Sequence, residues 1–158
     1  ALRTSLLSLA ATIPDSKAMY GKPGEVDPVR HFIGSASAWG GNPAQDAYYL
    51  TVTPSRNDGS ASYRLKVKDV PVDAFWSISV YNAAGYFQAN PQNAYTLNNL
   101  GAKREADGSI VVQFGACDKG VSNCLPVTAG WNYMVRLYKP QARVLDGSWQ
   151  FPQAVPAG

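Results

Sequence analysis

The first forty residues have the spacing of apolar positions that is typical of helices. The segment "LRTSLLSLAATI" repeats apolar residues at intervals of three and four, which predicts an amphipathic helix over 2–13 that ends at Pro14. The segment "DPVRHFIGSASAWGG" predicts a second helix over 29–39, because Asp27 is a suitable N-cap and Pro28 fits the first helical position. We therefore expect two helices at the N-terminal end.

From residue 47 onward the apolar spacing changes to a period of two, which is typical of strands. The segment "SYRLKVK" alternates most regularly, with three apolar residues on one face and three basic residues on the other. Strands separated by turn signals are predicted at 47–54, 62–68, 75–82, 94–100, 109–115 and 131–140 and, after a further turn, within 145–152.

These elements predict a mainly β fold, best described as a jelly-roll-like antiparallel β-sandwich with two N-terminal helices. The length of 158 residues fits a single domain over 1–158, with a helical segment 1–41 and a β-sandwich 47–152. The first helix begins abruptly and has no N-cap. We therefore expect the chain to be a fragment or a processed half of a longer protein.

The charge is mild and its distribution favours a solvated surface. The formal net charge is +3, and charged residues make up 16% of the chain. Arg64, Lys66 and Lys68 share one face of a predicted strand, where an outer face in water is favoured over an anion or nucleic-acid surface. No apolar run reaches about 18 residues, so we predict no membrane span. Because the net charge is mild, we also predict no nucleic-acid partner.

The two cysteines leave two interpretations open. Cys117 and Cys124 lie in the loop "GACDKGVSNCLP", where they either form a disulfide or remain two reduced thiols. A disulfide is favoured and implies an oxidising compartment, namely the periplasm or the outside of the cell. Two cysteines do not complete a four-ligand zinc site, and the single histidine is distant in sequence. We predict no metal and no cofactor.

Residues suited to catalysis are few. His31 is the only histidine, with Ser35 and Ser37 nearby on a predicted helix, but no G-x-S-x-G motif is present. A capping or packing role is the stronger interpretation of His31. Several carboxylates, such as Asp58 in "NDG" and Asp107 in "ADG", lie in turns, which gives them a local backbone explanation.

The aromatic residues carry the strongest functional indication. The chain has 4 Trp, 9 Tyr and 5 Phe, and Tyr and Trp combine a flat apolar face with a polar atom suited to sugars or other polar ligands. Ordinary packing in the sheets is the alternative for each of them. Arg136 lies in the middle of a predicted strand, so it is either exposed, paired or a ligand anchor. The candidate ligand-binding residues are Tyr81, Asn90, Tyr95, Arg136 and Tyr138.

Several motifs occur in the order seen in a known family. "DPVRHFIGSASAWGGNPAQDAYYL", "AFWSISVYNAAGYFQANPQNAYTLNNL", "ADGSIVVQFG", "NCLP", "WNYMVRLYKP" and "VLDGSWQFP" resemble the bacterial domain-of-unknown-function family numbered 1214 over 27–152. The resemblance implies the jelly-roll-like fold and export from the cytoplasm. It also implies that the chain is the C-terminal half of a protein whose N-terminal half is the companion family numbered 1254. The family has no agreed activity.

Two departures from the family pattern affect the expected site. Many members have an Arg where this chain has Ala94, which removes a possible cationic contact to a ligand. Many also have a Trp in "NWLP" where this chain has Cys124. We therefore expect an exported module that binds a small polar or carbohydrate-like ligand or docks on a partner domain. The alternative is a hydrolase of unknown substrate whose site a missing N-terminal domain completes.

Overall fold

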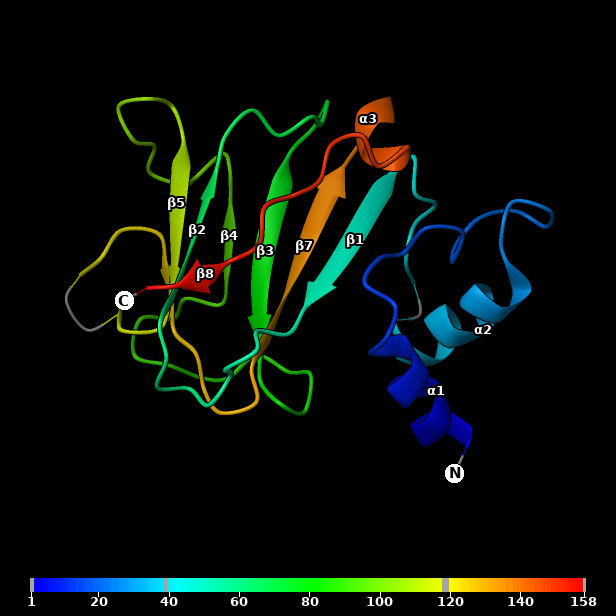
Figure 1. The fold of residues 1–158 in the computed structure, drawn as a ribbon, viewed down its shortest axis with the longest axis horizontal. Helices are drawn as coiled ribbons and strands as arrows, with labels where there is room; N and C mark the ends of the chain where they lie inside the picture. Colours follow the sequence, from blue (N-terminus) through cyan, green and yellow to red (C-terminus); the bar gives the residue numbers. More distant parts are fainter. Residues whose placement is uncertain (1, 39, 118–119, 158) are drawn as a thin grey trace. The chain divides into compact units, whose positions relative to one another are not determined.

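The computed structural model describes residues 2–38, 40–117 and 120–157 (Figure 1). Strands follow two N-terminal helices, so the mainly β prediction is confirmed. The elements in chain order are α1 (Leu2–Ala10), α2 (Pro28–Ser37), β1 (Ala47–Val52), β2 (Tyr63–Val67), β3 (Trp76–Tyr81), β4 (Thr96–Asn98), β5 (Ile110–Phe114), β6 (Cys124–Leu125), β7 (Asn132–Tyr138), α3 (Ala142–Leu145) and β8 (Val155–Pro156).

The strands form two four-stranded sheets, with the orders β1-β7-β3-β4 and β6-β5-β2-β8. β2 pairs antiparallel with β5 and β8, and β3 pairs antiparallel with β4. β6 runs parallel to β5, so the prediction of antiparallel pairing throughout is wrong for this pair. β6 lies at one edge of its sheet, beside β5. The jelly-roll arrangement of the strands stays a prediction.

The chain divides into two compact units. Unit 1 comprises Ala1–Leu50, Pro71–Ala74 and Arg136–Trp149. Unit 2 comprises Thr51–Val70, Phe75–Val135 and Gln150–Gly158. β1 and β7 each continue from one unit into the other along the chain. A single domain over 1–158 remains an expectation from length.

Both N-terminal helices of unit 1 end earlier than their apolar patterns suggest. α1 ends at Ala10, after which Thr12 and Ile13 donate backbone hydrogen bonds to carbonyls three residues earlier. This tighter final turn is common where a helix stops before proline. α2 ends at Ser37, and the predicted last residue, Trp39, lies outside the described residues.

The N-terminal end of α2 agrees with the sequence prediction. The side chain of Asp27 accepts a hydrogen bond of 2.8 Å from the backbone N–H of Arg30, and Pro28 occupies the first turn. This bond satisfies one of the N–H groups that a helix start leaves without an internal partner. Asp27 therefore fixes where α2 begins.

We expect Asp27→Ala to lower the free energy of unfolding by about 0.5–2 kcal/mol, because the N–H of Arg30 loses its acceptor. Asp27→Ser is the control, since serine caps helices nearly as well. Chemical denaturation followed by circular dichroism compares the two variants. Equal stability of Asp27→Ala and the wild-type protein would contradict the capping role.

The strands of unit 2 confirm the predicted alternation. In β2 the side chains of Tyr63, Leu65 and Val67 are buried, and the basic residues between them are exposed. β3 buries Trp76 on one face. Its opposite face also contains a buried residue, Ser79, which donates to the hydroxyl of a threonine on β4 at 3.1 Å.

Aromatic side chains from both sheets meet in the core of unit 2. The ring of Phe114 on β5 lies 5.3 Å from Trp131 and 4.9 Å from Tyr133, measured between centroids. Tyr63 on β2 meets Trp131 edge to face at 5.8 Å. Trp131, Tyr133 and Phe114 are completely buried. Burial of large rings contributes much of the stability of such a core.

The last predicted strand is wrong in its position. Residues 142–145 form the short helix α3, and the turn that follows is held by Asp146, whose carboxylate accepts from the backbone N–H of Ser148 at 2.8 Å. Phe151 is buried and its ring packs edge to face against Trp76. The final strand β8 begins only at Val155. An isolated buried aromatic residue resembles a short strand when only the apolar pattern is considered.

Candidate functional site

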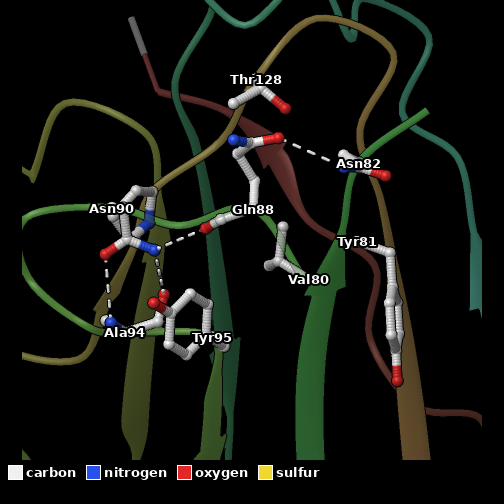
Figure 2. A pocket seen from close by; sticks show the side chains of 9 residues that line it. Val80, Tyr81, Asn82, Gln88, Asn90, Ala94, Tyr95 and Thr128 are labelled. Carbon is white, nitrogen blue, oxygen red and sulfur yellow. Dashed lines mark hydrogen bonds between the residues drawn. The ribbon is translucent and has the colours of Figure 1, made fainter. Parts of the chain in front are cut away.

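A depression in unit 2 gathers side chains from the end of β3, the loops that follow it and the segment after β6 (Figure 2). Its volume is about 10 Å³, which is room for about one water molecule, so a larger ligand would lie across it. The lining side chains are uncharged at neutral pH. They belong to Val80, Tyr81, Asn82, Gln88, Asn90, Ala94, Tyr95, Pro126 and Thr128.

Three aromatic rings stack in a row at this depression. The centroid of Phe87 lies 5.1 Å from that of Tyr81 and 5.4 Å from that of Tyr95, with interplanar angles of 13° and 24°. Phe87 is 50% exposed, and both tyrosines are half-buried. Stacked rings restrict one another's orientation. Tyr81, Phe87 and Tyr95 therefore form a partly exposed apolar surface, here called the ring platform.

Asn82 closes the loop that carries Phe87. Its Oδ1 accepts hydrogen bonds of 3.0 Å from the backbone N–H groups of Ala84 and Tyr86. Its Nδ2 donates to Oε1 of Gln88 at 3.2 Å. An asparagine side chain that bonds to nearby backbone in this way stabilises a turn. Asn82 therefore helps to hold Phe87 in the ring platform.

Asn90 closes the next loop in a similar way. Its Nδ2 donates to the carbonyls of Gln88 and Ala94, and its Oδ1 accepts from the backbone N–H of Ala94, all at 3.1 Å (Figure 2). These bonds fix the backbone that leads directly into Tyr95. Asn90 thus has a structural role in the loop, and its predicted contact with a ligand stays a prediction.

The other side of the depression includes Pro126 and Thr128, which follow β6. Asn123 anchors this segment just before β6. Its Nδ2 donates to the carbonyls of Lys103 at 2.7 Å and Val111 at 3.1 Å, and its Oδ1 accepts from the N–H of Lys103 at 2.9 Å. The side-chain amide thereby pairs with backbone much as a strand would. This gives a physical role to the asparagine of the "NCLP" motif.

The disulfide between Cys117 and Cys124 is confirmed, with the Cα atoms 5.6 Å apart. It joins the loop after β5 to the first residue of β6. The interpretation as reduced thiols is therefore wrong in this structure. Within residues 2–38, 40–117 and 120–157, no group of three or more His, Cys, Asp or Glu side chains is arranged to hold a metal ion.

The structure brings together three of the five predicted ligand-binding residues. Tyr81, Asn90 and Tyr95 all line the depression. Arg136 and Tyr138 lie on β7 in unit 1, are half-buried and do not line it. A ligand contact for any of the five stays a prediction.

Sequence reasoning missed Asn82, Gln88 and Thr128 as lining residues. The segment "NAAGYFQ" contains a signal for the first two, because an asparagine followed by glycine indicates a turn that brings later residues back to it. Thr128 had no such signal, because its position depends on the pairing of β6 with β5.

The residues considered for catalysis have local structural partners in unit 1. Nδ1 of His31 lies 2.8 Å from the carbonyl oxygen of Met19. The hydroxyls of Ser35 and Ser37 donate to backbone carbonyls one helical turn earlier, those of His31 and Ile33. Serine bonds of this kind are common within helices. The packing interpretation of His31 therefore has direct contacts in its favour.

Three carboxylates share one turn sequence, Asp-Gly-Ser. Asp58, Asp107 and Asp146 each accept a hydrogen bond from the backbone N–H of the serine two residues later, at 2.9, 2.9 and 2.8 Å. Their glycines all have a φ near +80°. The local backbone explanation of these carboxylates is therefore confirmed.

We expect the carboxyls of Asp58 and Asp107 to titrate below the usual pKa range of aspartate. The backbone N–H of Ala61, followed by the Arg56 side chain, holds the pKa of Asp58 well below its usual range. The Ser109 hydroxyl has the main effect in lowering the pKa of Asp107. Because each pKa is lower in the folded state, the stability that it contributes is present above pH 3.8 and is lost as the pH falls further.

The measurement is an NMR titration of the aspartate carboxyl carbons between pH 5 and pH 1.5. In Asp107→Asn the acid-induced loss of stability should become less steep, because one lowered pKa is removed. An Asp107 carboxyl that titrates at the value of an unfolded peptide would contradict this expectation.

These observations define a mainly β protein with a disulfide and an open, uncharged depression beside stacked aromatic rings. Among the described residues, no helix has the length and apolar character required to cross a membrane. The family described as "Protein of unknown function (DUF1214)" matches residues 46–142, and the chain belongs to this family. No curated protein matches the sequence.

Two solved structures share the fold. The VPA0106 protein from Vibrio parahaemolyticus is 23% identical, with a TM-score of 0.77 over 98% of this chain. An uncharacterised protein from Burkholderia cenocepacia is 18% identical, with a TM-score of 0.55 over 78% of this chain. The chain spans 42% and 32% of the lengths of these proteins. At these identities the likeness extends to the fold alone.

Proposed function

We propose that this protein binds a small, neutral, polar ligand of carbohydrate-like shape at the depression in unit 2. The observation that carries the proposal is the ring platform, a row of three stacked and partly exposed rings beside lining residues that include three amides. Aromatic faces cover the apolar side of a sugar ring, and amides serve its hydroxyls. Because no lining side chain is charged, a neutral ligand suits the site better than an anion.

The test is a binding screen of the oxidised protein by thermal shift, with neutral mono- and disaccharides and with the matching uronic acids. A ligand at 100 times its Kd adds about 2.7 kcal/mol of stability. This corresponds to an increase in Tm of about 5–10 °C for a chain of this size. Neutral sugars should stabilise the protein more than the acids.

A pair of neighbouring variants tests the site itself. Phe87→Ala removes the middle ring of the platform and should weaken binding about ten-fold or more. Tyr86→Ala is the matched control, because Tyr86 is 72% exposed and does not belong to the stack. A screen without any response, or equal effects of the two variants, would overturn the proposal.

A second role, docking on a companion domain, has its own support in unit 1. Large apolar side chains of both helices are exposed, with Leu9 on α1 at 50% and Phe32 on α2 at 53%. Exposed apolar patches of this kind often mark interaction sites. We take the occupant to be the companion domain of the family numbered 1254, since the chain spans only 42% of the Vibrio protein. No arrangement among the described residues favours the hydrolase alternative.

Hydroxyl-radical footprinting tests the docking role. In a polypeptide that carries the companion domain, Leu9 and Phe32 should be labelled several-fold less than in the present chain. Tyr86 in unit 2 is the exposed reference residue. Equal labelling of Phe32 in both polypeptides would contradict docking at this surface.

The disulfide supports a proposed location in the periplasm or outside the cell, since such bonds persist in oxidising compartments. A jelly-roll-like β-sandwich is the arrangement that we propose for the strands of the two sheets. Both proposals agree with the expectations drawn from the family resemblance.

A further inference from the structure

The hydrogen bonds around Asn82 fix the orientation of one amide that lines the depression, that of Gln88. Oδ1 of Asn82 accepts two backbone N–H groups, so the amide cannot turn over without placing its NH₂ group against those donors. Its Nδ2 is therefore directed at Gln88. Only the oxygen of Gln88 accepts that donor, at a distance of 3.2 Å.

The consequence is a donor group of known identity at the depression. With Oε1 of Gln88 bound to Asn82, Nε2 is directed away from Asn82 (Figure 2). No protein atom among the described residues accepts a hydrogen bond from this Nε2. The Nδ2 atoms of Asn82 and Asn90, in contrast, donate within their own loops.

We infer that Nε2 of Gln88 is the donor through which the depression recognises an acceptor oxygen of its ligand. The ligand is then a neutral ring compound that lays an apolar face on the ring platform and offers a carbonyl, ether or hydroxyl oxygen to Gln88. Asn82 is a positioning residue, because it decides which atom of Gln88 faces the ligand. This inference rests on the proposed function and narrows its ligand class.

Two small ring compounds distinguish acceptor from donor recognition. Cyclohexanone has a carbonyl that only accepts hydrogen bonds, and the cyclohexylammonium ion only donates them. In NMR titrations the wild-type protein should bind cyclohexanone more tightly, and the side-chain N–H signals of Gln88 should shift. Gln88→Met keeps the length of the side chain without the donor and should weaken cyclohexanone binding about five-fold.

Three further variants refine the test. Gln88→Glu offers an acceptor in place of the donor and should reverse the preference between the two probes. Asn82→Asp still accepts from the N–H groups of Ala84 and Tyr86 and turns a second oxygen toward Gln88. The Gln88 amide should then turn over, its N–H protons should exchange more slowly with water, and cyclohexanone should bind less tightly. Gln92→Met, an exposed residue outside the depression, is the control.

The outcomes separate this inference from the proposed function. Cyclohexanone or sugar binding that Gln88→Met leaves unchanged would overturn the role of Gln88, and the proposed function would stand. If the Gln88 N–H protons exchange with water at the same rate in Asn82→Asp as in the wild-type protein, the positioning role of Asn82 is overturned. Absence of binding by the wild-type protein to the sugars and to both probes would overturn the proposed function and the inference together.

Discussion

Trp131→Ala is expected to lower the free energy of unfolding by about 3–5 kcal/mol, the usual cost of truncating a buried tryptophan. The indole of Trp131 is completely buried between rings of both sheets, namely Tyr63, Phe114 and Tyr133. These rigid neighbours cannot easily fill the space that the indole leaves. For a chain of this size the loss corresponds to a fall in Tm of roughly 6–20 °C.

Trp131→Phe is the informative comparison for this prediction. Nε1 of Trp131 is buried and has no hydrogen-bond partner among the described residues. Phenylalanine therefore removes part of the ring without breaking a hydrogen bond, and it also removes a polar atom that burial penalises. We expect a smaller loss than for alanine, measured by calorimetry. A larger loss for phenylalanine would show that the indole N–H has a partner in solution.

Gly59→Ala is expected to destabilise the protein by about 2–5 kcal/mol, because it combines two costs. The φ of Gly59 is +82°, a conformation that costs other residues about 1–2 kcal/mol. A Cβ atom there would also lie 2.7 Å from the backbone nitrogen of Ala129 and 2.8 Å from the carbonyl carbon of Thr128. Such overlap with backbone typically adds 1–3 kcal/mol.

The chain contains matched controls for Gly59→Ala. Gly108 and Gly147 occupy the same position of the other two Asp-Gly-Ser turns, with φ values of +80° and +82°. A Cβ at Gly147 would meet nothing within 4 Å, and one at Gly108 would have only an ordinary contact at 3.9 Å. Alanine at these positions should therefore lower the free energy of unfolding only by the cost of the positive φ, about 1–2 kcal/mol. Equal losses at all three positions, measured by urea unfolding, would show that the contact with Thr128 and Ala129 has no energetic effect.

The elements that the sequence predicts well are those whose pattern is set by one-sided burial. In β2, Tyr63, Leu65 and Val67 are buried and the residues between them are exposed, so a period of two is visible in the sequence. The cap of α2 at Asp27 is equally local. By contrast, β6 has two residues and depends on the disulfide, Asn123 and β5 for its position, so no pattern could reveal it.

The candidate site was predictable only in part for a related reason. Tyr81 lies at the end of a strand with a regular pattern, and Tyr95 lies near it in sequence, so the aromatic character of the site was visible. Arg136 was considered because it is charged and mid-strand, but the structure places it in unit 1 and outside the depression. The selection of Gln88 depends on the direction of amide hydrogen bonds, which a sequence does not contain.

The two loops that Asn82 and Asn90 close have a consequence for engineering. Asn82 and Asn90 each close their own loop through bonds that span four residues or fewer. The side chains of exposed loop residues such as Ala84 and Gln92 take no part in these bonds, so they are free to vary without loss of the loop geometry. The two loops thus combine a fixed backbone with exposed side chains that can be replaced. A scaffold for a combinatorial library requires this property.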